Sequence, residues 1–95
     1  MLEFNASNLE ELESEARLRA HEVSVYVVSG VIKALGSDVD KIIIGTLKSL
    51  DLDLSIDKSG YLECLETNLV RCEEAEEYEL CKEAIVWIKK LRVKI

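Results

Sequence analysis

The sequence predicts an α+β fold, in which two N-terminal helices precede a β-hairpin and a C-terminal helix, all packed as one small domain over residues 1–95. Three observations predict it. Apolar residues recur at helical spacing in the first third of the chain, apolar and acidic residues alternate around residue 54, and the last segment changes from acidic to basic. A length of 95 residues fits a single domain.

The first helix is predicted to begin near Asn8, because Ser7-Asn8-Leu9-Glu10 has the pattern of a capping box. An apolar stripe then continues at steps of three and four residues. Its members are Leu9, Leu12, Ala16, Ala20, Val23, Val27, Val31 and Ala34. The valines of the second half favour a strand, but the unbroken stripe predicts one long helix that ends near Gly36.

A second helix is predicted over residues 39–50, after a cap at Ser37 or Asp38. Its apolar stripe contains Val39, Ile42, Ile43, Thr46, Leu47 and Leu50. The alternation of leucines and aspartates that follows, over residues 51–57, predicts a half-buried strand. A turn over residues 57–60 and a return strand from Tyr61 toward Val70 complete the predicted hairpin, and the pattern leaves open which face of the return strand is buried.

The final helix is predicted from its charge gradient, because acidic residues suit a helix N-terminus and basic residues a C-terminus. It opens with Glu73, Glu74, Glu76 and Glu77 and closes with Lys89, Lys90 and Arg92. Its predicted buried stripe is Tyr78, Cys81, Ala84, Ile85, Ile88 and Leu91.

The composition narrows the classes of function. A net charge of −7 opposes binding to nucleic acid, which requires clustered Lys and Arg. No run approaches the ~20 apolar residues of a membrane span, and the first residues lack a secretory signal, so a cytoplasmic location is expected. Abundant Glu, Lys, Ile and Val with no Gln indicates a heat-adapted source.

The residues that could carry chemistry are few, which predicts a protein that is not an enzyme and needs no cofactor. A nucleophile needs a base held by a third group, but the chain has a single histidine, His21. Cys64, Cys72 and Cys81 lack the short paired spacing of zinc sites. Together with His21 they would nominally fill a tetrahedral site, so these four remain candidates beside the default of buried packing. A redox-linked disulfide from Cys64 to Cys72 or Cys81 also stays open.

From about Val39 onward, the predicted order of helix, hairpin, Cys72, Cys81 and apolar helix resembles small-molecule-binding domains of the vinyl-reductase type and their vesicle-trafficking relatives. The resemblance implies a ligand-binding function.

The first functional hypothesis is a non-catalytic interaction module, which forms a homo-oligomer or binds a protein partner through apolar helix surface. Val25, Tyr26 and Val28 lie off the main stripe of the long helix, so more than one of its faces is apolar. Gly30 would let a second helix approach closely. The predicted interface is therefore Val25, Tyr26, Val28 and Gly30. The alternative is a small-molecule or metal-binding domain that uses the region of Cys64, Cys72 and Cys81.

Overall fold

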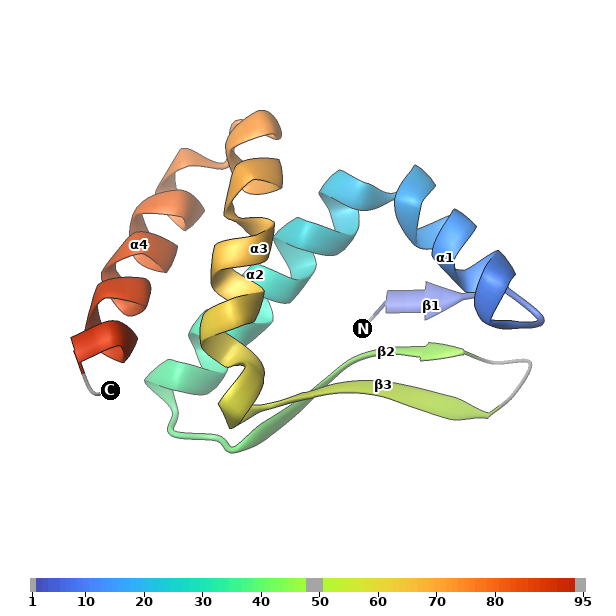
Figure 1. The fold of residues 1–95 in the computed structure, drawn as a ribbon, viewed down its shortest axis with the longest axis horizontal. Coiled ribbons are helices and arrows are strands. Elements are labelled where there is room, and N and C mark those ends of the chain that lie inside the picture. Colours follow the sequence, from blue (N-terminus) through green and yellow to red (C-terminus); the bar gives the residue numbers. More distant parts are fainter. Residues whose placement is uncertain (1, 48–50, 94–95) are drawn as a thin grey trace.

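A three-stranded sheet carries four helices in the computed structural model, which describes residues 2–47 and 51–93. The strands are β1 (Leu2–Phe4), β2 (Lys41–Leu47) and β3 (Leu52–Asp57), in the order β1-β2-β3. β1 runs parallel to β2, whereas β2 and β3 are antiparallel. In Figure 1 the helices lie above the sheet and α4 is farthest from it. The α+β class predicted from the sequence is confirmed.

The long helix predicted from Asn8 is divided into α1 (Leu9–Leu18) and α2 (Ala20–Gly36). It begins near Asn8 as expected, but the cap is one residue later than the predicted Ser7–Glu10 box: the Asn8 side chain accepts a hydrogen bond from the Glu11 amide at 2.9 Å, and the Glu11 carboxylate accepts one from the Ser7 amide at 2.8 Å. The break falls at Arg19, which has φ −109° and ψ 27°. The bend lets α1 cover β1 while α2 packs against α3 and α4.

The helix predicted over residues 39–50 is wrong: Lys41–Leu47 is the strand β2, and residues 48–50 lie outside the described part. Three consecutive isoleucines, Ile42 to Ile44, explain the difference, because branched side chains favour the extended backbone. Gly36 does end the preceding helix as predicted. Asp38, at φ 55°, then turns the chain toward β2.

The strand predicted after residue 51 is confirmed as β3, but its hairpin partner is β2, with Lys41 opposite Asp57 and Leu47 opposite Leu52. Residues predicted as the return strand belong instead to helix α3 (Tyr61–Glu74), which follows a short 3₁₀ turn, η2 (Lys58–Gly60). The buried residues Tyr61, Leu65 and Cys72 share one helical face, which explains why neither alternating face looked clearly buried in the sequence.

The C-terminal helix α4 (Tyr78–Val93) is confirmed, with Cys81, Ala84 and Ile88 buried. Its start lies later than the acidic run predicted, because Glu73 and Glu74 complete α3. The vinyl-reductase-type resemblance loses its basis, since neither the helix over residues 39–50 nor the return strand forms. Within residues 2–47 and 51–93, no helix has the length and apolar character needed to cross a bilayer.

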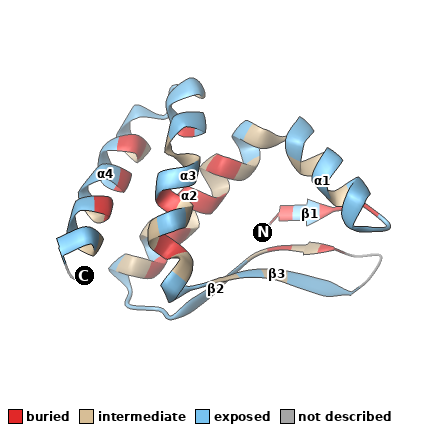
Figure 2. Cartoon of the chain, viewed as in Figure 1, coloured by how far each residue is buried: buried red, intermediate tan, exposed pale blue. Residues whose placement is uncertain are grey.

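The main core lies where α2, α3 and α4 meet, and Figure 2 shows buried positions on the faces that these helices turn toward one another. Tyr61 is fully buried there, and its hydroxyl donates a 3.0 Å hydrogen bond to the Val39 carbonyl. A smaller cluster of Leu2, Phe4, Ala6 and Leu47 lies beneath α1. The core therefore buries one face of α2, while Val25 and Tyr26, toward the other face, pack against the two clusters and stay partly exposed.

Candidate functional site

The face of α2 that the core does not bury forms a continuous row, which we call the α2 stripe. It consists of Glu22, Val25, Tyr26, Ser29, Gly30 and Lys33, all exposed or partly exposed. Steps of three and four residues place them on one side of the helix. The opposite side contains Ser24, Val27, Val28, Val31 and Ala34, which are buried. The α2 stripe combines an apolar middle with a charged residue at each end.

Two open hollows lie along the α2 stripe. The first, of about 510 Å³, is lined by Leu2, His21, Glu22, Val25, Tyr26, Ser29, Ala75 and Glu77. The second, of about 300 Å³, is lined by Tyr26, Gly30, Lys33, Ala34, Ser37, Val39 and the isoleucines 42–44. Tyr26 lines both, so the two hollows adjoin at this ring.

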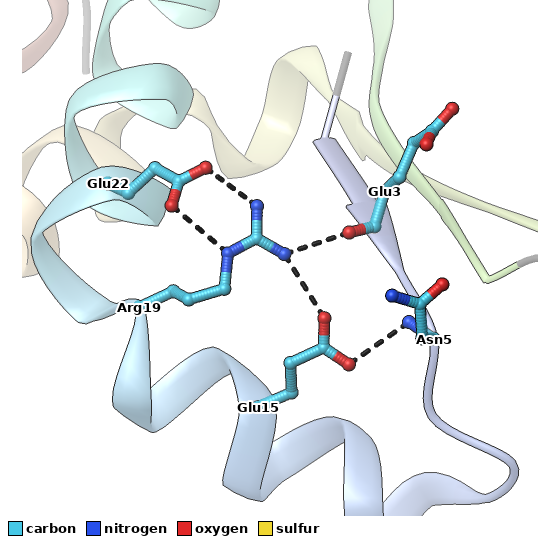
Figure 3. Close-up of polar contacts among 5 residues, drawn as sticks. All are labelled: Glu3, Asn5, Glu15, Arg19 and Glu22. Atoms are coloured by element: carbon cyan, nitrogen blue, oxygen red, sulfur yellow. Dashed lines mark hydrogen bonds and ion pairs between the residues drawn. The ribbon is translucent and has the colours of Figure 1, made fainter.

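Glu22, at the N-terminal end of the stripe, is held by Arg19. The guanidinium donates two hydrogen bonds to the Glu22 carboxylate, at 2.6 and 3.1 Å, as Figure 3 shows. The same group donates to Glu15 at 3.1 Å and to the Glu3 carbonyl at 2.8 Å. The hydrogen bond from Arg19 lowers the pKa of Glu22, so its carboxylate is ionised at neutral pH. One cation shared by two carboxylates leaves a net negative charge here.

Lys33, at the other end of the stripe, is exposed and makes no ion pair with another residue of the described ranges. The nearby acidic residues Asp38 and Asp40 already face Lys58, at 3.1 and 3.8 Å. The hydrogen bond to Asp38 raises the pKa of Lys58, which keeps this group charged. Asp38, Asp40 and Lys58 together keep one negative charge, which offsets that of Lys33, although Lys33 itself pairs with no described residue.

Three of the four predicted interface residues, Val25, Tyr26 and Gly30, lie on the α2 stripe. Val28 does not: it is completely buried in the core and offers no surface to a partner. The element that approaches Gly30 is strand β2 of the same chain and not the expected second helix, because a Cβ there would lie 3.4 Å from Ile42 Cδ1.

The structure separates His21 from the cysteines that the sequence grouped with it. His21 is exposed on α2, and its Nε2 lies 3.5 Å from a Glu74 carboxylate oxygen. Cys64 is partly buried on α3, with Asn68 Nδ2 at 2.7 Å from its carbonyl oxygen and 3.9 Å from its Sγ. In residues 2–47 and 51–93, no group of three or more His, Cys, Asp or Glu residues is arranged to hold a metal ion.

Cys72 and Cys81 are buried as free thiols in the main core. Burial raises the pKa of Cys72 to about 11, and burial raises the pKa of Cys81 as well. Both thiols are therefore neutral at physiological pH, which makes them poor nucleophiles in the folded protein.

Sequence reasoning missed the charged ends of the stripe and the contribution of the strands to the hollows. Glu22 and Lys33 share their helical face with Tyr26 and Ser29, so the spacing contained this signal. The role of Val39 and of residues 42–44 was hidden by their assignment to a helix. Comparisons with protein-family models, with curated proteins and with solved structures found no match for the chain.

Proposed function

We propose that the chain is a non-catalytic interaction module that self-associates through the α2 stripe. A helix that packs one face on a core normally presents a polar face to water. α2 instead presents Val25 and Tyr26 beside two hollows. Both side chains are partly buried, Val25 against the main core and Tyr26 against the smaller cluster, and their remaining apolar surface beside the hollows is the observation that supports the proposal.

The outer groove between α3 and α4 is a weaker candidate surface. It is lined by Leu69, Ile85 and Ile88, but Arg92 forms an ion pair with Glu66 on its border. Both charged groups would have to be desolvated or displaced by a partner there. The α2 stripe also has an ion pair at one end, Glu22 with Arg19, but the first hollow beside it is larger, about 510 Å³ against about 310 Å³.

A charge placed in the middle of the stripe tests the proposal. Ser29→Glu adds a carboxylate to the first hollow, whereas Ser14→Glu adds the same group to the exposed surface of α1. Light scattering across a concentration series should give twice the 10.7 kDa chain mass for the wild type and Ser14→Glu, and one chain mass for Ser29→Glu. A monomeric wild type, or a dimeric Ser29→Glu variant, would refute self-association through this face.

A small-molecule site is the second candidate function, favoured by the size of the first hollow. Its volume of about 510 Å³ lies within the ~300–1,000 Å³ of ligand pockets. This site differs from the one predicted near the three cysteines, because Cys72 and Cys81 are buried in the core. Saturable binding of one anilinonaphthalene sulfonate per chain, lost in Ser29→Glu and retained in Ser14→Glu, would support it. Binding that does not saturate would eliminate it.

The proposal also includes a cytoplasmic location. Buried free thiols at Cys72 and Cys81 suit a reducing compartment. The net charge of −7 supports a protein partner, a second copy included, in preference to nucleic acid.

A further inference from the structure

The first hollow, beside the N-terminal half of α2, has apolar walls that the chain's own packing holds in place. Leu2 comes from β1, Val25 and Tyr26 from α2, and Ala75 from the turn after α3. Leu2 is buried in the smaller cluster, against which Tyr26 also packs, and Val25 packs against the main core. The walls are therefore formed before any ligand arrives, as is usual for small-molecule sites.

Glu77 lies on the border of this hollow and has no cation of its own. Its amide donates a 3.0 Å hydrogen bond to the Cys72 carbonyl, and its carbonyl accepts one of 3.0 Å from the Cys81 amide. These bonds fix the backbone of Glu77 between α3 and α4. Its exposed side chain makes no ion pair with another residue of the described ranges. The carboxylate is therefore free to bind a cation from outside the chain.

The charges around the hollow are unbalanced toward the negative. Arg19 binds Glu22 but is shared with Glu15. His21 Nε2 lies 3.5 Å from a carboxylate oxygen of Glu74. Even with His21 counted as a cation, two cations stand against four carboxylates, those of Glu15, Glu22, Glu74 and Glu77. Among the described residues that line the hollow there is no lysine or arginine.

We propose that the first hollow binds an organic cation, a small molecule that joins an apolar body to a positively charged amine. The inference rests on the small-molecule function given above as the second candidate, and it specifies the ligand class. The apolar body would lie against Leu2, Val25 and Ala75, and the ammonium group would pair with Glu77. The surrounding negative field attracts such a ligand and strengthens this pairing.

Tyr26 suits the same ligand, because the face of an aromatic ring attracts a cation. Two other rings of the chain already have a cation above them: the Arg19 guanidinium lies 5.1 Å from the Phe4 ring centre, and Lys90 Nζ lies 4.7 Å from that of Trp87. No cation of the described ranges occupies the Tyr26 ring in this way. An ammonium group in the hollow would supply one.

Charge discriminates among ligands of the same shape. A neutral ligand would remove water from the Glu77 carboxylate without providing a partner for it, which costs free energy. An anion would add repulsion from the surrounding carboxylates. An anionic dye should therefore bind this hollow more weakly than a cationic dye with the same rings.

A matched series of naphthalene ligands tests this preference at pH 7. 1-Naphthylmethylamine is a cation, 1-naphthylmethanol is its neutral analogue, and 1-naphthoate is an anion. The full chain is diluted until light scattering gives one chain mass, so that no second copy covers the hollow. In fluorescence titrations the amine should bind about tenfold more tightly than the alcohol, and the naphthoate should bind most weakly. Added salt should weaken the binding of the amine more than that of the alcohol.

Two isosteric variants locate the preference. Glu77→Gln removes the charge at the hollow, whereas Glu83→Gln removes the same charge from the exposed surface of α4. Glu77→Gln should lower the affinity for the amine to within about threefold of that for the alcohol. Its affinity for the alcohol should stay unchanged, which also shows that the variant is folded. Glu83→Gln should keep the wild-type preference.

The outcomes separate the ligand class from the small-molecule function. A preference for the amine that is lost in Glu77→Gln and kept in Glu83→Gln supports the organic-cation site. If the wild type binds the alcohol or the naphthoate as tightly as the amine, or if Glu77→Gln keeps the full preference, the ligand class is overturned and the small-molecule site is not. The absence of saturable binding for all three ligands overturns both.

Discussion

Gly45 lies directly against Leu2, with so little space between the strands that a Cβ at position 45 would come within 2.9 Å of the Leu2 carbonyl oxygen. The same Cβ would lie 3.2 Å from Phe4 Cε2. Leu2 and Gly45 are opposite each other in the parallel β1–β2 ladder. The absence of a side chain at position 45 therefore lets β1 pair with the sheet and support α1.

Gly45→Ala should displace β1 and destabilise the chain by about 1–3 kcal/mol, the usual cost of overpacking. Gly36→Ala is the matched control, because nothing lies within 4 Å of a Cβ at that position. It should leave stability unchanged or raise it by up to about 1 kcal/mol. Urea unfolding measures both changes, and equal effects at the two glycines would contradict this role of Gly45.

Arg19 should contribute to stability in a pH-dependent way, because it joins Glu22, Glu15 and the Glu3 carbonyl. The pKa of Glu22 is lowered from its ordinary value of 4.5. Its stabilisation is therefore present above pH 4.5 and is lost as the pH falls through the lowered pKa. Arg19→Met should lower the melting temperature at pH 7 and flatten the decline in acid. An unchanged acid profile would argue against this linkage.

The cysteines should differ in reactivity toward a thiol reagent. At pH 8 in the folded state, the partly buried Cys64 should react first, while Cys72 and Cys81 react only after unfolding in guanidinium. The raised pKa of Cys72, about 11 against an ordinary 9, adds a prediction with a definite sign. The stability that the folded protein gains from keeping this thiol protonated is complete below pH 9 and is lost as the pH rises toward 11. Rapid labelling of Cys72 in the native protein would contradict its burial.

The Tyr61 hydroxyl should stabilise the junction of α2 with β2, since it bonds the Val39 carbonyl from a fully buried ring. Tyr61→Phe should cost about 1 kcal/mol in chemical unfolding. Tyr61→Ala, which also opens a cavity, should cost about 3–5 kcal/mol. Tyr78 is 60% exposed, so Tyr78→Phe should change little. An equal loss of stability in Tyr61→Phe and Tyr78→Phe would show that the hydrogen bond from Tyr61 to the Val39 carbonyl does not stabilise the fold.

Local patterns predicted the elements whose signals are not ambiguous. The start of α1 near Asn8, the end of α2 at Gly36 and the alternation of β3 all follow from contacts within a few residues. The α4 stripe was predicted for the same reason. The bend at Arg19 was not, because it depends on the Glu3 carbonyl, sixteen residues away.

The misassigned segments contain residues that satisfy two periods at once. Residues 42–44 fit a helical stripe and also favour a strand, and pairing with β3 decides between the two. In α3, the leucines and Cys64 are spaced so that the sequence does not show which side is buried. Packing against α2 decides it, and the Ser24 hydroxyl of α2 donates a 2.8 Å hydrogen bond to Asn68 of α3. The apolar second face of α2 was visible in the sequence, whereas the burial of Val28 needed the packed core. The heat-adapted source stays a prediction.

The most direct test of self-association through the α2 stripe is an isotope-filtered nuclear Overhauser measurement on a mixture of labelled and unlabelled chains. It detects only contacts between two copies. Self-association through the α2 stripe predicts signals from the Tyr26 ring protons of one chain to stripe residues of the other, and none from the exposed Leu18 of α1. Intermolecular signals that avoid Tyr26, or none at millimolar concentration, would contradict it.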